Sequence, residues 1–123
     1  MFTTIKKRAD FVRAFSAGKK FVRSSFILQM VKRAEGHIEA PQTTRIGFTV
    51  TKKMGNAVIR NRIKRRLREA CKEALEKYGV AGHDYVIVSR IKALDCDFEE
   101  LKKDMNFAFR RIPDVDDAGK KND

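Results

Sequence analysis

Eight lysines and arginines fall within residues 52–68, and no aspartate or glutamate lies among them. Ammonium and guanidinium groups donate charge-assisted hydrogen bonds to phosphate oxygens, so this density of cations suits a polyanionic ligand. Apolar side chains occur between the charges at helical spacing, at Val58, Ile59, Ile63 and Leu67. A disordered basic tail lacks such a pattern. The segment therefore predicts a polyanion-binding surface on a folded helix.

The basic helix should begin after Asn56 and run to about Tyr78, with one apolar arc and one basic arc at about 100° per residue. The apolar arc, which should face a sheet, contains Ile63, Leu67, Ala70, Cys71, Ala74 and Tyr78. The candidate phosphate-binding residues are Lys52, Lys53, Asn56, Arg60, Asn61, Arg62, Lys64, Arg65 and Arg68. Arg60 and Arg62 lie in the first turns, where free N–H groups and the helix dipole also favour phosphate.

A solvated charged face is the alternative interpretation of this helix. Such faces are usually stabilised by acidic side chains three or four residues away. Here Glu69, Glu73 and Glu76 provide that neutralisation only in the second half of the helix. Uncompensated like charge destabilises a folded domain through self-repulsion. We therefore favour the polyanion-binding interpretation for residues 52–68.

The sequence contains no constellation typical of a catalytic or metal site. His37 and His83 have no paired carboxylate or cysteine motif. Cys71 and Cys96 are far apart and lack the CxxC spacing of zinc ligands and redox centres. The acidic cluster at residues 95–100 lies at an expected helix start, where capping accounts for it. We assign no catalytic residue and no metal ligand to this chain.

Length and charge indicate one basic domain. The chain has 123 residues, 42% of them hydrophobic, and a formal net charge of +12. We expect the domain over residues 1–113 and a disordered acidic tail over residues 114–123, which holds four aspartates and two lysines. A nucleic acid or an anionic membrane would suit this charge. The sequence has no apolar run approaching the roughly 20 residues that span a bilayer, and no signal-peptide pattern, so we expect a cytoplasmic protein without a membrane partner.

Periodicity and breaker residues predict the remaining elements. The predicted helices cover residues 8–17 and 97–112, and the predicted strands cover residues 19–33, 45–51 and 84–90. Gly18 is expected to end the first helix as a left-handed cap, and Pro113 to end the last one. Residues 34–44 should form a connection. Phe11 and Phe15 share one side of the first helix, where an aromatic pair is usually part of a core.

A resemblance to a known family is carried by residues 45–69, which read RIGFTVTKKMGNAVIRNRIKRRLRE. The segment resembles the signature of the protein subunit of bacterial ribonuclease P, in which a Lys-Lys turn, a Gly-x-Ala-Val step and an Arg-Asn-Arg core open a long basic helix. The flanking DFVRAF and DYVIVSR segments also fit, so the resemblance covers about residues 5–112. Thr51 and Met54 replace the usual Ser and the usual Val or Ile, which are conservative departures.

The resemblance implies an α+β fold, a small α/β sandwich with the element order α-β-β-β-α-β-α. The family has a short strand followed by a longer one where periodicity alone predicts a single strand over residues 19–33. Its strand–helix–strand crossover through the basic helix is left-handed, against the strong right-handed preference of parallel units.

The resemblance also implies a function and a second surface. The family's subunit joins a catalytic RNA, one protein to one RNA, in the endoribonuclease that removes the 5′ leader of precursor tRNA. The RNA carries the catalysis and holds most of the Mg²⁺, and the protein alone is expected to be inactive. The basic helix would contact RNA, and a cleft between the first helix and the sheet would bind the single-stranded leader. By this resemblance the leader-binding residues are Phe11, Phe15, Lys19, Lys20 and Arg23.

Three other functions are compatible with parts of the sequence. A general RNA-binding or ribosomal protein would carry the same charge. A DNA-binding protein would place a short helix and a tight turn before its recognition helix, whereas a predicted strand precedes this one. An enzyme in its own right would cleave precursor RNA without an RNA subunit.

Overall fold

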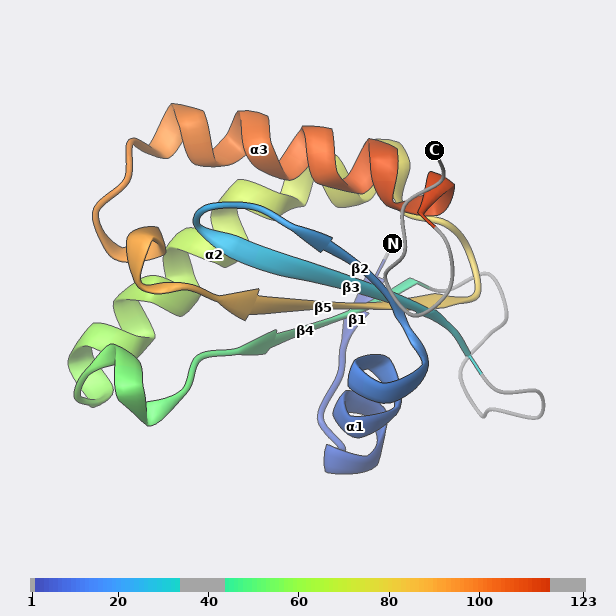
Figure 1. Cartoon of the computed structure of the whole chain (residues 1–123), viewed down its shortest axis with the longest axis horizontal. Coiled ribbons are helices and arrows are strands. Elements are labelled where there is room, and N and C mark those ends of the chain that lie inside the picture. Colours follow the sequence, from blue (N-terminus) through green and yellow to red (C-terminus); the bar gives the residue numbers. More distant parts are fainter. Residues whose placement is uncertain (1, 34–43, 116–123) are drawn as a thin grey trace.

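The computed structural model describes residues 2–33 and 44–115, whose arrangement is shown in Figure 1. The strands and α-helices are, in chain order, β1 (Phe2–Thr4), α1 (Arg8–Ala17), β2 (Lys19–Val22), β3 (Phe26–Lys32), β4 (Thr44–Thr49), α2 (Ala57–Tyr78), β5 (His83–Ser89) and α3 (Phe98–Arg111). The short 3₁₀ turns are η1 (Lys52–Met54), η2 (Ile91–Leu94) and η3 (Ile112–Asp114). His37, most of the predicted connection and residues 116–123 of the predicted tail lie outside the described residues.

A mixed sheet of five strands, in the order β1-β4-β5-β3-β2, forms the middle layer. β1, β4 and β5 are parallel, whereas β3 is antiparallel to β5 and β2 is antiparallel to β3. α2 and α3 cover one face of the sheet, and α1 covers the other (Figure 1). α2 joins the parallel neighbours β4 and β5, since parallel strands need a long crossover connection. The fold is therefore the α+β sandwich that was predicted.

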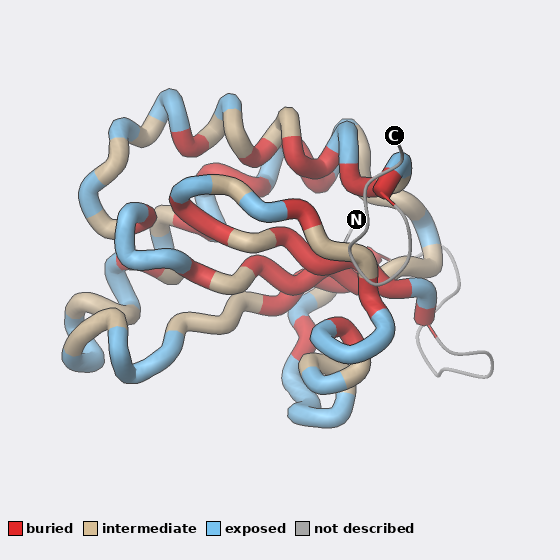
Figure 2. Tube along the Cα trace, in the orientation of Figure 1, coloured by how far each residue is buried: buried red, intermediate tan, exposed pale blue. Residues whose placement is uncertain are grey.

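The main core lies between the sheet and the α2–α3 layer, and Figure 2 shows buried residues concentrated along these facing surfaces. Ile63 and Leu67, from the predicted apolar arc of α2, are fully buried there. The hydroxyl of buried Tyr85 accepts a hydrogen bond from Val80 N at 2.9 Å, so its polar end is satisfied. A smaller cluster, formed by Ile5, Ala14, Val31 and Val86, joins α1 to the opposite face.

A buried network of charges also holds α1 to the sheet. Arg45 of β4 and Asp84 of β5 are register partners, and the Arg45 guanidinium donates hydrogen bonds of 2.8 and 2.5 Å to the Asp84 carboxylate. Asp10 of α1 lies 3.3 Å from the same guanidinium, and Arg33 lies 3.6 Å from Asp84. The hydrogen bonds that Arg45 donates to Asp84 raise the pKa of Arg45 above its ordinary value, so the cation is retained. The network connects α1 with β4, β5 and the end of β3.

The strand predictions needed two corrections. β1 is an additional first strand, and three residues are too few to carry a periodic signal. β2 and β3 replace the single strand predicted by periodicity over residues 19–33, in agreement with the two strands that the family resemblance implied. The observed order is therefore the predicted one with a strand added before α1.

One expectation about a helix end was also wrong. Gly18 has φ −82° and is extended rather than left-handed. Glycine is required there for a different reason, because a Cβ would lie 2.4 Å from Ala14 O and 3.0 Å from Met30 O. Val115, which was assigned to the tail, is only 3% exposed and belongs to the main core. The described body thus extends two residues beyond Pro113.

Candidate nucleic-acid interface

The start of α2 is fixed by a glycine turn and a side-chain cap. Gly55 has φ +138°, a conformation that favours glycine, and it links η1 to the helix. The Asn56 side chain accepts a hydrogen bond from Ile59 N at 3.0 Å, as the sequence predicted. Asn56, a predicted RNA-binding residue, is therefore engaged as the N-cap. The cap places Lys52 and Lys53 of η1 directly before the first helical turn.

We call the solvent-facing cations of η1 and of α2 as far as Arg68 the basic face. Its members are Lys52, Lys53, Arg60, Arg62, Lys64, Arg65 and Arg68, with Asn61 between them. All except half-buried Arg60 and Lys64 are exposed. None of these cations forms an ion pair within residues 2–33 and 44–115, so their charge is available to a ligand. Arg60 Nε donates to Gly55 O at 3.2 Å, which braces the turn before the helix.

Arg66 is the exception among the cations of the basic segment. Its Nε donates to Ala93 O at 2.9 Å, a terminal nitrogen donates to Cys96 O, and its guanidinium lies 5.8 Å from the Phe98 ring centre. These contacts attach η2 and the start of α3 to α2. Arg66 has a structural role, and the prediction had left it out of the phosphate-binding set.

A groove of about 450 Å³ lies between α1 and the start of α2. We call it the β4 groove, and it is lined by Lys6, Arg8, Phe11, Phe48, Thr49, Val50 and Lys64. β1 pairs with residues 44–46 of β4, so the rest of β4 has no neighbour on that side among the described strands. Half-buried Phe11 lies against Gly47, where a Cβ would come within 2.7 Å of the ring.

The β4 groove and the basic face meet at α2. Lys64 belongs to both, and the guanidinium of Arg68, one helical turn further on, lies 5.8 Å from the Phe48 ring centre. Cations of the helix therefore adjoin aromatic rings of the groove.

The two phenylalanines of α1 have different environments. Phe11 packs against the smaller core cluster and lines the β4 groove. Phe15 is 66% exposed, and Lys20 covers its ring with Nζ 4.9 Å from the ring centre. Lys20 Nζ also donates to Phe15 O at 2.6 Å. Phe15 is thus not part of the core, and Phe11 is only partly so.

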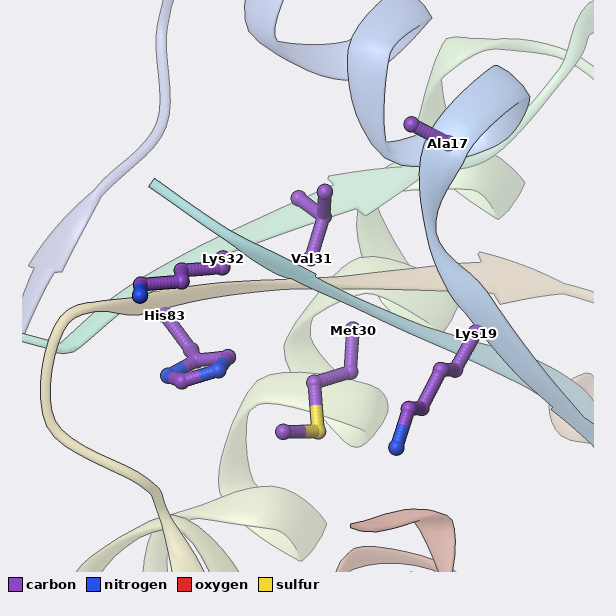
Figure 3. Close-up of a pocket in the computed structure, with 6 residues that line it drawn as sticks. All are labelled: Ala17, Lys19, Met30, Val31, Lys32 and His83. Atoms are coloured by element: carbon purple, nitrogen blue, oxygen red, sulfur yellow. The ribbon is translucent and has the colours of Figure 1, made fainter. Parts of the chain in front are cut away.

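Lys19 and Arg23, predicted to line the leader cleft, lie on the other side of the sheet. Lys19 Nζ donates to Pro113 O at 2.8 Å, and Figure 3 shows its side chain on the opposite side of β3 from Ala17 of α1. Arg23 forms a 2.6 Å ion pair with Asp104 of α3. Successive strand residues point to opposite faces, so Lys19 and Lys20 cannot both face α1. The structure pairs Phe15 of α1 with Lys20 of β2, places Phe11 in the β4 groove, and puts Lys19 and Arg23 on the other side of the sheet.

Sequence reasoning missed five residues that line the β4 groove. They are Lys6, Arg8, Phe48, Thr49 and Val50. Each lies next to an element boundary, just before or at the start of α1 or near the end of β4. The one available signal was the Lys-Lys-Arg run at residues 6–8, which adds charge close to Phe11.

Residues 2–33 and 44–115 contain no group of three or more His, Cys, Asp or Glu side chains arranged to hold a metal ion. His83 Nδ1 lies 3.0 Å from Ala81 O, so this ring nitrogen has a backbone partner. In the same part of the chain, no helix is long and apolar enough to cross a membrane.

The sequence matches one family of known proteins. The family model of ribonuclease P matches residues 2–113. The chain is 47% identical over 109 residues to the ribonuclease P protein component of Bartonella quintana, and the aligned region covers 88% of this chain and 79% of that protein. It is 42% identical over 107 residues to the same component of Erythrobacter litoralis, with coverages of 87% and 83%.

Solved structures show the same architecture. The ribonuclease P protein from Thermotoga maritima superimposes with a TM-score of 0.72 at 26% identity, covering 89% of this chain and 96% of that one. The protein from Staphylococcus aureus gives a TM-score of 0.68 at 28% identity, with coverages of 89% and 95%. Sequence and fold lead to one conclusion: the chain belongs to the ribonuclease P protein family.

Proposed function

We propose that this chain binds the RNA subunit of ribonuclease P through the basic face and the 5′ leader of precursor tRNA through the β4 groove. As a member of the family, it is a protein component of this endoribonuclease, which acts in tRNA 5′ maturation together with an RNA subunit. The observation that carries the proposal is the junction of the two surfaces at Lys64 and Arg68.

The two surfaces suit two kinds of RNA. Phosphate contacts orient a nucleic acid without reading its sequence, so the basic face suits a structured RNA. Phe11 and Phe48 offer aromatic surface for bases, while Lys6, Arg8 and Lys64 supply cations for the backbone. This combination is typical of sites for single-stranded RNA. A leader in the β4 groove would lie beside the cations that hold the RNA subunit.

We assign the cleavage itself to the RNA subunit. The described residues offer no ligand cluster for Mg²⁺, so we derive no step through a metal on this chain and expect the RNA to hold the ion. The protein's cations would orient RNA. A complex of one protein and one RNA in the cytoplasm completes the proposal.

Reconstitution with a bacterial ribonuclease P RNA at low Mg²⁺ concentration tests this function, with cleavage of a leader-bearing precursor tRNA as the readout. We expect the chain to stimulate cleavage and to cut nothing by itself. Absence of stimulation would contradict the proposal. Cleavage without RNA would indicate an enzyme in its own right. Equal affinity for precursor and mature tRNA in the presence of the RNA subunit would indicate a general RNA-binding protein.

The double variant Arg62→Gln/Arg65→Gln tests the basic face. Both side chains are exposed, so the fold should be retained. We expect weaker binding to the RNA subunit and a log–log salt slope that is shallower by about 0.7 to 0.9 for each lost phosphate contact. Lys102→Gln/Lys103→Gln on α3 removes the same charge elsewhere and should leave the slope nearly unchanged. Equal losses in the two variants would show that net charge alone matters.

A further inference from the structure

A second aromatic and cationic cluster lies on the α3 side of the sheet. The guanidinium groups of Arg23, Arg111 and Arg110 lie 4.9, 5.3 and 5.9 Å from the ring centre of Phe107. The ring of Phe21 lies 5.9 Å from the same ring, tilted by 60°. Neither the basic face nor the β4 groove uses any of these five residues.

All members of the cluster except Arg110 line a groove of about 370 Å³, which we call the β2 groove. Its walls come from β2, α3 and η3, and its lining residues are Phe21, Val22, Arg23, Phe107, Arg111, Asp114 and Val115. β2 is an edge strand, and two strands separate it from β4 in the sheet. Val22 is 58% exposed, and Arg110 and Arg111 are exposed as well. The β2 groove is therefore open to solvent and separate from the β4 groove.

The positive charge continues past the end of the β2 groove. Lys19 Nζ bonds to Pro113 O, and Pro113 is the neighbour of Asp114 in the groove wall. Lys19 also lines an adjacent pocket of about 300 Å³ together with Lys32 and His83. Figure 3 shows the side chains of Lys19 and His83 on the same side of β3. A chain of phosphates leaving the β2 groove would meet further cations there.

We propose that the β2 groove is a second binding site for single-stranded RNA, holding one or two nucleotides. Bases of single-stranded RNA stack on aromatic rings and on guanidinium planes, and the groove offers both kinds of surface within 6 Å of the Phe107 ring centre. Arg23 is held by Asp104, so the exposed charged ends of Arg110 and Arg111, with Lys19, would contact the flanking phosphates. The proposal goes beyond the RNA contacts of the basic face and the leader contacts of the β4 groove.

A second copy of the chain is the competing occupant, because an edge strand can pair with another edge. Charge opposes this pairing. Lys19, Lys20 and Arg23 lie on or next to β2, and Arg110 and Arg111 stand beside it, so two copies would bring like charges together. An RNA backbone would instead neutralise them.

Binding of fluorescein-labelled octauridine, measured by anisotropy in the full chain, tests the proposal. The background is Arg62→Gln/Arg65→Gln, which weakens the basic face. In it we expect Phe107→Leu to lose about fivefold or more in affinity, the lower end for one stacked base. Arg110→Gln/Arg111→Gln should flatten the salt slope by up to about 1.4, at about 0.7 per single-strand phosphate. The matched control Lys102→Gln/Lys103→Gln should change neither quantity.

Photocrosslinking with octauridine containing 4-thiouridine gives an independent readout, and we expect adducts in the peptides that hold Phe21 or Phe107. Equal losses in the arginine variant and the lysine control, or no adduct in those peptides, would overturn the proposal. So would a concentration-dependent dimer that only the arginine variant abolishes. Because Arg110 and Arg111 are exposed, the Arg110→Gln/Arg111→Gln variant should fold and still tests the proposal if Phe107→Leu unfolds.

In the reconstituted holoenzyme, 4-thiouridine in the leader or in the RNA subunit identifies the RNA that supplies the strand. If the β2 groove binds no RNA, stimulation of cleavage should remain, because it depends on the basic face. If the proposed function is wrong, stimulation itself should be absent.

Discussion

At the scale of single residues, substituting Phe15 tests whether this side of α1 stabilises the fold or binds RNA. It is 66% exposed, so Phe15→Ala should leave the midpoint of urea unfolding nearly unchanged. We expect the variant to lose affinity for leader-bearing precursor by about 1 to 3 kcal/mol, as for one stacked base. Leaderless substrate should bind as before. Equal losses on both substrates would assign Phe15 to the fold rather than to the leader.

Cys71 and Cys96 should differ in reactivity. Burial raises the pKa of the Cys71 thiol to about 12 from an ordinary value near 9, whereas Cys96 is only half-buried. N-ethylmaleimide at pH 8 should therefore modify Cys96 well before Cys71.

The raised pKa of Cys71 also makes stability depend on pH. Because this pKa is higher in the folded than in the unfolded chain, the stability that the neutral thiol contributes is complete below pH 9 and is lost as the pH rises towards 12. Cys71→Ala should unfold with a shallower pH dependence in that window, by up to about 1.4 kcal/mol per pH unit.

At the scale of elements, the start of α2 depends on one side chain. Asn56 accepts the hydrogen bond from Ile59 N, so Asn56→Ala should lower the free energy of unfolding by about 0.5 to 2 kcal/mol. Asn56→Ser keeps a capping oxygen and should restore most of this loss in urea titrations. RNA affinity should follow the same order, since the cap positions the first turn of the basic face. A loss of affinity in both variants would show that the Asn56 amide contacts RNA directly.

The elements also show what the sequence could predict. α2 was predictable because its 22 residues repeat the 3.6-residue period many times. The N-caps of α2 and α3, Asn56 and Asp97, also carry recognisable side chains. β1 was not, since Phe2–Thr4 pairs with β4 through contacts that are distant in sequence. Lys19 and Arg23 were expected beside α1 because of their charge, but successive residues of a strand point to opposite faces of the sheet, and these two point away from α1. The β4 groove needed the tertiary structure, as its lining comes from separate elements.

At the scale of the whole molecule, the buried charges at Asp84 hold the α1 layer to the sheet. Asp84→Asn keeps the shape of the side chain but removes the buried negative charge that faces Arg45 and Arg33. We expect a loss of about 3 to 5 kcal/mol in the free energy of unfolding. Asp10→Asn should cost less, because its side chain is 15% exposed and contacts Arg45 at 3.3 Å. Its effect should appear as faster amide hydrogen exchange in α1, with α2 and α3 unchanged; uniform acceleration would contradict this division into layers.

Gly47 has a consequence for which RNA strands can fit. A Cβ at this position would lie 2.7 Å from the Phe11 ring, so the missing side chain sets how deeply α1 settles onto β4. Any larger residue would lift the helix, widen the β4 groove and separate the base-stacking surface from Lys64 and Arg68. If the β4 groove holds the leader as proposed, selectivity for thin, single-stranded substrates over duplexes would then depend on the absence of one carbon atom at Gly47, a position that does not itself line the groove.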